Sequence, residues 1–471
     1  MPSSNVSTFS LRVCESAVDT LSAGDRVTLQ RGDPLRILPE RREVHAGRWT
    51  ESEQAVVSKR YLPHKRKERD SQLEWNGLKQ LQAAKLPAPQ PLYIAEQPED
   101  GSTWVVMRYI ENAQPLQTLL SQLSQDETVE VMQQLAQIVQ QMHDVGAYQS
   151  DQHIGNWAYD GKQVYLLDAG TVRFESTALP AEKRLTDLAA LCATLAPCAL
   201  KAFHRALNNP EHLPALMAAT TESHRKRLKK HYQKTRRECT EYGVRNGSAY
   251  QGLFSKTADL ELVDRFFEQP DALMNQGSRL KSGNTCTVQC FSHNGTAYVL
   301  KRYNLKPLLT RIRRNFKESR AMKSWSNAWC LLLANIPTAR PVAVYEERTG
   351  LLRGLCYLLM EQIDGQLLPE YLAEHDADEE QATVVDSIAE IWTSMRAIRA
   401  VHRDLKATNW MVDTNGKAVL FDLDALSFGL PDQAFLQGQA KDYARFMKNW
   451  SEQAELTQRF SEKLIKGLEH E

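Results

Sequence analysis

The sequence predicts an α+β protein built from two diverged copies of one domain. Two segments, 146–170 and 401–425, share one pattern: an Asp, an Asn five residues later followed by Trp, a polar turn, an apolar run and a second Asp. Apolar runs typical of strands and apolar residues at helical spacing follow one another in a similar order in both halves. Repetition over this distance indicates duplication of a whole folding unit.

The offset between the copies is nearly constant along the chain. Seven pairs of residues keep the same order at offsets between 242 and 255: Lys59 and Lys301, Pro87 and Pro337, Met107 and Met360, Asp151 and Asp404, Asn156 and Asn409, Asp168 and Asp422, and Asp187 and Asp442. So many landmarks at one spacing do not arise by accident. We therefore interpret the chain as a tandem protein.

Each copy is predicted to begin with strands and a helix and to end mostly in helices. Residues 55–61 and 296–303 have the apolar runs of strands, each ending in a basic cluster. Residues 127–143 carry apolar side chains at three- and four-residue spacing, which is typical of a helix. Gly, Ser and Asn at 245–251 suggest a linker. The predicted domains are 1–250 and 251–471, each with a β-rich N-lobe and a helical C-lobe.

Composition excludes several classes of protein. Of 471 residues, 42% are hydrophobic and 25% charged, which is globular. Lys plus Arg (58) equals Asp plus Glu (58), so a general nucleic-acid binder is not expected. Eight cysteines without a CxxC predict neither a disulfide framework nor a zinc site. The most apolar long stretch, 185–200, is too short to span a bilayer, and the N-terminus lacks signal-peptide features. A cytoplasmic protein is expected.

The second copy carries a pattern that points to phosphoryl transfer. Residues 401–409 read VHRDLKATN and match the protein-kinase catalytic loop, H-R-D-L-K-x-x-N. Asp404 is the candidate base, and Lys406 can reach the transferring phosphoryl group. Asn409 and Asp422, thirteen residues later, are candidate Mg²⁺ ligands. Phosphoryl transfer requires mainly a positioned nucleophile and neutralised phosphate charge, and these residue types supply both.

Upstream residues of the second copy complete a candidate ATP site. Lys301 ends an apolar strand, where a Lys that pairs the α- and β-phosphates is expected. Gly283, in the segment 280–285, marks a short candidate phosphate-covering loop. Met360 and Glu361 end another apolar run and are expected to contact the cofactor.

The first copy keeps the acids but not the whole loop. Asp151 is its candidate base, and Asn156 and Asp168 are its candidate metal ligands. Lys59 lies on a strand, and Glu74, on the following helix, can pair with it. Gln and Ser replace the His and Arg of the catalytic loop.

Each copy has lost something that the other retains. His153 of the first copy stands where Lys406 stands in the second. When the copies are aligned on their matching prolines, Ser324 falls at the position of Glu74, and Glu318, further up that helix, is a poor substitute. We expect the second copy to be active. For the first, an active kinase and a regulatory pseudokinase both stay open.

Other features favour structural interpretations. Asp187 and Asp442 are expected to brace the catalytic-loop backbone of their copies, and Trp157 and Trp410 to pack in cores. The basic run 224–231 is interpreted as a solvated helix face, or as a contact for anionic lipid or a phosphorylated saccharide. A second basic run, 311–317, adds to the expectation of contact with a membrane surface.

The second copy resembles the bacterial lipopolysaccharide kinase family, kinase-like enzymes that phosphorylate Kdo or heptose of the inner core. The matching stretches are KRY around Lys301, the helix start at 319–321, NIPTARPVAVYEERTGLLRG, HRDLKATNW and FDLDAL. The resemblance covers roughly 277–450, and the first half looks like a more distant relative over about 26–190.

The resemblance implies a function. It implies transfer of phosphate from ATP, with Mg²⁺, to a sugar hydroxyl of a lipopolysaccharide core precursor. The enzyme would be peripheral to the cytoplasmic face of the inner membrane. Two alternatives remain. One is a protein Ser/Thr kinase, which the short segment from Asp422 to Asp442 without an A-P-E signature disfavours. The other is a pair of pseudokinase modules acting as a scaffold in core assembly.

Overall fold

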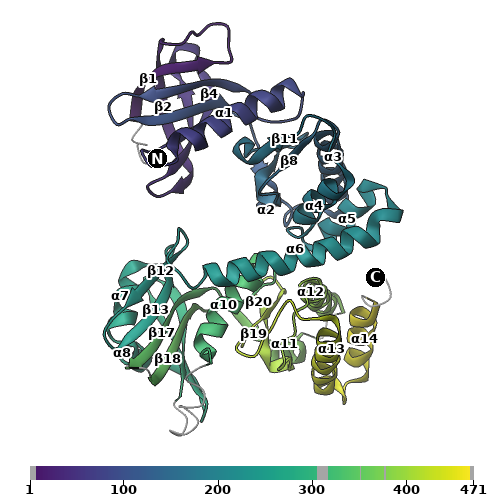
Figure 1. Cartoon of the computed structure of the whole chain (residues 1–471). Helices are drawn as coiled ribbons and strands as arrows, with labels where there is room; N and C mark the ends of the chain where they lie inside the picture. Colours follow the sequence, from purple (N-terminus) through teal and green to yellow (C-terminus); the bar gives the residue numbers. More distant parts are fainter. Residues whose placement is uncertain (1–6, 305–316, 351, 376–377, 467–471) are drawn as a thin grey trace. The chain divides into compact units, whose positions relative to one another are not determined.

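The computed structural model describes residues 7–304, 317–350, 352–375 and 378–466. The chain divides into two compact units, Met1–Thr220 and Thr221–Glu471, and both contain helices and strands (Figure 1). The predicted α+β class is confirmed. The division falls thirty residues before the expected boundary at 250. Residues 245–251 form no linker, because Gly247 N donates to Tyr250 O at 3.0 Å in a hairpin turn. Gly, Ser and Asn mark hairpin turns as readily as linkers.

The N-terminal unit begins with a closed six-stranded antiparallel barrel. Its strands follow the order β1-β2-β3-β4-β6-β5, and pairing between β1 and β5 closes it. The strands are β1 (Ser7–Ser16), β2 (Arg26–Leu38), β3 (Arg42–Trp49), β4 (Gln54–Tyr61), β5 (Pro91–Gln97) and β6 (Ser102–Arg108). Apolar side chains that alternate along these strands, among them Leu29, Trp49 and Trp104, fill the interior. Helix α1 (Lys67–Ala83) connects β4 to β5 and packs against β5 and β6.

The rest of the N-terminal unit is mainly helical, with short strands that carry the candidate site. The elements are β7 (Gln114–Pro115), α2 (Leu116–Leu119), α3 (Gln125–Asp144), β8 (Ala147–Gln149), β9 (Trp157–Tyr159), β10 (Val164–Leu166), β11 (Val172–Phe174), α4 (Ala181–Cys192), α5 (Pro197–Leu207) and α6 (Leu213–Lys234), which continues past Thr220. A capping box of Ser124 and Glu127 fixes the start of α3, where the sequence predicts a helix. The apolar stretch 185–200 forms parts of α4 and α5, because Pro197 begins a new helix.

The C-terminal unit contains an open seven-stranded antiparallel sheet. Its order is β12-β13-β17-β18-β16-β15-β14. The strands are β12 (Tyr242–Asn246), β13 (Tyr250–Ser255), β14 (Ser278–Ser282), β15 (Cys286–His293), β16 (Thr296–Tyr303), β17 (Pro341–Thr349) and β18 (Leu352–Glu361). From β13 to β14, the strand order β13-β17-β18-β16-β15-β14 matches the order β1-β5-β6-β4-β3-β2 around the barrel. The sheet stays open here, because α7 (Leu260–Glu268) and α8 (Pro270–Gln276) lie between β13 and β14 in the chain and bury Phe266, Phe267 and Leu273 on it.

The second half of the C-terminal unit is helical, with three short strands. The elements are α10 (Arg320–Leu333), β19 (Gly365–Leu367), α11 (Leu368–Glu374), α12 (Asp378–Ala397), β20 (Trp410–Asp413), β21 (Ala418–Leu420), α13 (Asp432–Met447) and α14 (Ala454–Lys466). Trp410, Phe446 and Phe460 lie at the centre of the core. Among the described helices, none combines the length and apolar character needed to cross a membrane.

Candidate active site

In the N-terminal unit, a buried lysine joins the sheet to helix α1 and to the candidate metal ligand. Lys59 projects from β4, and its Nζ donates to Glu74 Oε1 at 2.6 Å and to the carbonyl of Leu167 at 3.1 Å. Asp168 Oδ1 lies 3.8 Å from the same Nζ. The second carboxylate oxygen of Glu74 accepts from Gly170 N at 3.0 Å. The predicted pairing of Lys59 with Glu74 is present, and it holds α1 against the backbone that follows Asp168.

Burial and charge act in opposite directions on these two carboxylates. Burial raises the pKa of Glu74, although Lys59 opposes the shift. Burial also disfavours ionisation of Asp168, but the positive charges of Lys59 and Arg42 outweigh it and lower the pKa of Asp168. Asp168 is therefore held as the anion that a cation ligand must be.

A pocket of about 320 Å³ opens beside Lys59 and Asp168. Val57, Met107 and Leu167 form part of an apolar wall. The polar lining includes Asn156, Asp168 and four basic side chains: Lys59, Arg36, Arg42 and Arg108. Arg36 and Arg42 flank the β2–β3 turn, the hairpin that matches the position of Gly283 in the other unit. The sequence interpretation missed both arginines. Their position, one hairpin upstream of the lysine strand, is the signal that could have identified them.

The loop that carries Asp151 is anchored at its base and open at its tip. Asp187 Oδ2 lies 2.9 Å from His143 Nε2, and its Oδ1 accepts from Gln149 N at 3.2 Å, so it braces the loop as expected. Asn156 Nδ2 donates to the carbonyl of Asp151 at 2.9 Å. The Asp151 side chain itself is 75% exposed, and it lies 3.9 Å from His153.

In the C-terminal unit, the lysine binds the candidate metal ligand directly. Lys301 Nζ donates to Asp422 Oδ1 at 2.5 Å across the gap between β16 and the segment after β21. Burial opposes the charge of both groups. Tyr303 and Asp422 nevertheless raise the pKa of Lys301, and the positive charge of Lys301 lowers the pKa of Asp422. Asp422 adopts a left-handed conformation with φ of 62°.

The HRD loop of the C-terminal unit is built around Asp442. The carboxylate of Asp442, on α13, accepts from His402 N at 2.6 Å and from Arg403 N at 2.9 Å, as predicted. Burial raises its pKa to about 6, although these two amides counteract the shift. His402 Nε2 lies 3.1 Å from the carbonyl of Phe421, which ties the loop to the residue before Asp422.

Three donors surround the carboxylate of Asp404. Asn409 Nδ2 donates to the Asp404 carbonyl at 2.8 Å and lies 3.5 Å from Oδ2. Lys406 Nζ is 4.0 Å from Oδ2, and Arg445, one turn beyond Asp442 on α13, forms an ion pair with Oδ1. Arg445 was not identified from sequence. In the first copy Ala190 stands at the matching position, three residues after Asp187.

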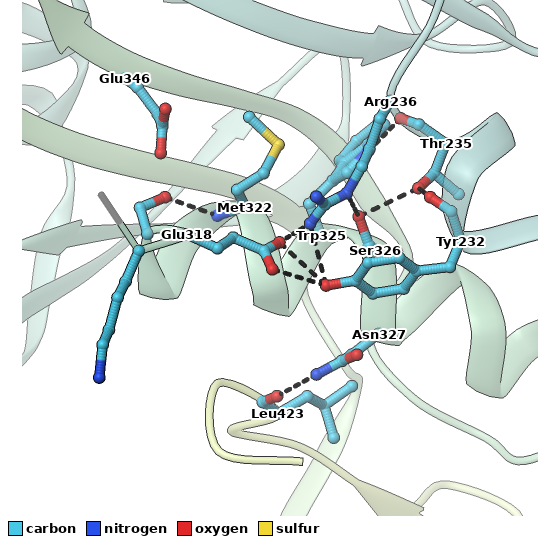
Figure 2. A network of polar contacts seen from close by, with 12 residues as sticks. Tyr232, Thr235, Arg236, Glu318, Met322, Trp325, Ser326, Asn327, Glu346 and Leu423 are labelled. Atoms are coloured by element: carbon cyan, nitrogen blue, oxygen red, sulfur yellow. Dashed lines mark hydrogen bonds and ion pairs between the residues drawn. The ribbon is translucent and has the colours of Figure 1, made fainter. Parts of the chain in front are cut away.

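Helix α10 is held without a glutamate. Ser324, at the position of Glu74, lies 3.1 Å from the hydroxyl of Tyr303. Glu318 does not substitute for the missing glutamate, because it binds Tyr232 and Arg236 instead (Figure 2). Asn327 is buried, and its Nδ2 donates to the carbonyls of Leu423 at 2.8 Å and Leu426 at 3.1 Å. These bonds fasten α10 to the backbone just after Asp422.

The other predicted contacts lie at the edge of the C-terminal cleft. Gly283 is in the β14–β15 turn, where its N–H donates to the Cys286 carbonyl at 3.1 Å. A Cβ there would have room, so the backbone does not require glycine. Met360 pairs with Val299 and Glu361 with Tyr298 across β16 and β18, whereas Lys301 pairs with Leu358. Met107, which matches Met360, lines the pocket of the N-terminal unit.

The residues fit a weakly chelated Mg²⁺. Within the described ranges, no three His, Cys, Asp or Glu side chains are grouped as metal ligands. Each unit instead offers one Asn and one Asp near a lysine. Mg²⁺ in phosphotransfer sites is held by one or two carboxylates together with phosphates and water, so this ligand set is sufficient.

Comparisons with known proteins agree with this geometry. Over 88 residues, the chain is 33% identical to serine/threonine-protein kinase F of Synechocystis sp., an alignment that covers 18% of each protein. A family model described as "Lipopolysaccharide kinase (Kdo/WaaP) family" matches residues 41–195 and 271–467, one segment in each unit and together well over half of the chain. The chain therefore belongs to the lipopolysaccharide kinase (Kdo/WaaP) family, a family of kinases.

Proposed function

We propose that the protein transfers the γ-phosphate of ATP to a hydroxyl of a lipopolysaccharide inner-core sugar, heptose or Kdo. Both units are proposed to be kinase-like domains, with the C-terminal unit as the main catalyst. The observation that supports this best is the C-terminal constellation: the Lys301–Asp422 ion pair lies one peptide from Phe421, whose carbonyl binds the loop that presents Asp404.

In this proposal each C-terminal side chain has one task. Asp404 orients the acceptor hydroxyl and accepts its proton as the O–P bond forms. Lys301 binds the α- and β-phosphates, and Lys406 approaches the transferred group. Asn409 and Asp422 would hold Mg²⁺, which supplies positive charge to the phosphates. Arg445 fixes the Asp404 carboxylate and leaves its Oδ2 side to the acceptor.

We propose that the N-terminal unit binds nucleotide and transfers phosphate poorly. Its lysine and aspartate already line a pocket with three arginines, and Glu74 on α1 binds that lysine. Its candidate base, Asp151, lacks an arginine like Arg445 and is largely solvated. These features support a regulatory role for the N-terminal unit.

The match to a Ser/Thr kinase favours a second candidate, a protein kinase. The loop chemistry permits it. However, α13 begins at Asp432, ten residues after Asp422, which leaves little chain to dock a peptide. The acceptor we favour is a core precursor at the inner-membrane surface, with which the protein would make peripheral contact.

The decisive experiment measures phosphate transfer from ATP to purified core precursors and, in parallel, to protein substrates. Asp404→Asn should reduce turnover by about 10²–10⁴-fold without loss of ATP binding, because the base acts on the acceptor. Asp151→Asn should reduce it severalfold at most. If Asp151→Asn abolishes turnover and Asp404→Asn does not, the assignment of the two units is reversed.

Calorimetry on the intact chain tests nucleotide binding independently of the acceptor. Two Mg²⁺-dependent ATP-binding events are expected, one lost with Lys59→Ala and the other with Lys301→Ala. No binding in the wild type would refute the enzyme proposal and favour the scaffold.

A further inference from the structure

A second pocket, of about 430 Å³, lies within the C-terminal unit outside the candidate active site. It is formed by α6, α10 and the segment 426–429, and we call it the α6 pocket. Its ionisable lining consists of Arg225, Lys229 and Lys323, together with the phenol of Tyr232, and no carboxylate lines it. The pocket is therefore a cationic recess in a protein without net charge.

The cations face the pocket because α6 is amphipathic. His224 and Leu228 lie on its buried side, and burial lowers the pKa of His224 to about 4. Arg225 and Lys229, on the other side, remain at the surface. Arg225 is paired with Glu222, whereas in the described part of the chain no carboxylate lies within ion-pair distance of Lys229 or Lys323. The positive charges of Lys229 and Lys323 are thus available to bind an anion.

One wall of the α6 pocket is aromatic and rigid. The Tyr232 and Phe428 rings meet edge to face at 5.7 Å. The hydroxyl of Tyr232 is fixed by Glu318 at 2.9 Å and by Arg236 at 2.9 Å (Figure 2). Arg236 also lies over the Tyr232 ring, 4.3 Å from its centroid, so the ring is held in place. Together with Phe428 it offers aromatic surface to the apolar or ring portion of a ligand.

The floor of the pocket is bonded to both catalytic segments. Asn327, a lining residue, donates to the carbonyl of Leu423, directly after Asp422 (Figure 2), and to the carbonyl of Leu426. Ser427, also in the lining, exchanges backbone hydrogen bonds of 2.8 and 3.0 Å with Val401, directly before the HRD loop. A ligand held here contacts the backbone that positions Asp422 and Asp404.

We propose that the α6 pocket binds a phosphate-bearing ligand and orders the segment 423–429 when it does. Lys229 and Lys323 provide charge-assisted hydrogen bonds for a phosphate, and the rings contact its organic part. The N-terminal unit differs at the matching positions. At the matching offset of 250, the N-terminal unit has Leu73 and Gly77 in place of Lys323 and Asn327.

The test is hydrogen exchange on the full-length protein, with inorganic pyrophosphate as the probe. Exchange in 225–233 and 423–430 should slow on addition of pyrophosphate. The double variant Lys229→Ser/Lys323→Ser should require at least about tenfold more pyrophosphate for the same protection, about 1.4 kcal/mol of binding free energy. Lys230→Ser, an exposed neighbour on α6 outside the lining, is the matched control and should behave like the wild type.

Two further arms separate this site from its neighbours. Protection should persist in Lys301→Ala, whose substitution lies in the proposed ATP site. Protection that disappears in Lys301→Ala and survives in the double lysine variant would overturn the proposal. So would the absence of protection with both pyrophosphate and vesicles of phosphatidylcholine plus phosphatidic acid. Protection by these vesicles alone would identify the phosphate as that of a lipid, and protection by pyrophosphate would identify a free phosphate ligand.

Discussion

Glu74 and Ser324 stand at matching places in two helices, yet they make different contacts. Glu74 reaches both Lys59 and Gly170 N, so one side chain joins sheet, helix and metal-ligand loop. Ser324 contacts the hydroxyl of Tyr303, whereas Lys301 binds Asp422. The sequence predicted the missing glutamate. The sequence did not predict the contacts that hold α10 in place of the glutamate. Asn327 binds backbone carbonyls and Arg320 binds a carboxylate, and these groups come close only in the folded chain.

Glu74→Gln should weaken ATP binding to the N-terminal unit about tenfold, because Lys59 loses a charged partner. Ser324→Ala is the matched control and should change ATP binding to the C-terminal unit less than about twofold. Calorimetric titration of the full-length variants provides the measurement. Equal effects of the two substitutions would contradict the different roles assigned to them.

Buried His224 should make stability depend on pH. Its native pKa of about 4 lies below the ordinary 6.5, so between these values the unfolded chain binds a proton that the native protein does not. Stability is therefore lost as the pH falls from 6.5 to 4, by roughly 3 kcal/mol for this group. Asp442, with its raised pKa, acts in the opposite direction below pH 6.

The contribution of His224 is obtained by comparison with His224→Gln. The urea midpoint of the variant should fall less on acidification than that of the wild type. His212→Gln, at an exposed position, should leave the pH dependence unchanged. Parallel curves for wild type and His224→Gln would show that His224 is protonated equally in both states.

At the scale of elements, α1 and α10 approach the catalytic backbone by different means. A Cβ at Gly77 would lie 2.2 Å from the Ala169 carbonyl, so α1 packs directly on the segment after Asp168. At the matching place, α10 has Asn327, whose amide connects the helix to the segment after Asp422 with two hydrogen bonds. Arg320, at the start of α10, adds an ion pair with Asp424. The glycine allows direct contact between helix and backbone, whereas the asparagine makes the connection through its side chain.

Gly77→Ala should displace α1 and destabilise the N-terminal unit by about 1–3 kcal/mol, because neither backbone can yield easily. Loss of the nucleotide-binding event that depends on Lys59 should accompany it. Asn76→Ala, exposed on the same helix, is the control. Thermal unfolding and ATP titration measure the two effects. A stable Gly77→Ala variant with intact ATP binding would mean that α1 tolerates more separation than the contact suggests.

Local sequence patterns predicted the individual helices and strands better than the closure of the barrel. Residues 55–61, 127–143 and 296–303 were expected as strand, helix and strand, and they lie within β4, α3 and β16. The closed barrel and the α7–α8 pair were not foreseen. Closure depends on pairing such as Arg12 with Glu96, and no local pattern encodes a contact over that distance.

At the scale of the whole molecule, the main sequence result was the duplication, and the common strand order supports it. The candidate site was predicted where motifs are contiguous, as in the HRD loop. It was missed where charges come from elsewhere: Arg36 and Arg42 from a hairpin, Arg445 from α13. In the basic run 224–231, Arg225, Lys226, Lys229 and Lys230 are exposed, as expected for a solvated helix face, whereas His224 is buried. Residues 311–316 of the second run lie outside the described residues. Trp157 and Trp410 are fully buried in separate cores, as expected.

Because the cores share no described residue, the units should unfold in separable transitions. Trp157→Ala should lower the melting temperature of one calorimetric transition, and Trp410→Ala should lower that of the other. Each substitution should reduce the free energy of unfolding of its unit by about 3–5 kcal/mol. ATP should raise the melting temperature of each unit that binds it. The transition that no longer responds to ATP in Lys59→Ala belongs to the N-terminal unit, and the one that no longer responds in Lys301→Ala belongs to the C-terminal unit. A single transition that both substitutions shift would show one cooperative structure instead.

The β1–β5 seam of the barrel also sets an order of events during translation. Strands β1 to β4 pair with their neighbours in the chain and can form as soon as they emerge. The β5–β6 hairpin, which joins β4 to β1, is made only after α1 has been synthesised. Until then the nascent meander has two unsatisfied edges, and such edges recruit other strands. Ribosome-bound chains arrested before Pro91 should accordingly be far more sensitive to protease than chains arrested well beyond Arg108, once the hairpin is clear of the ribosome.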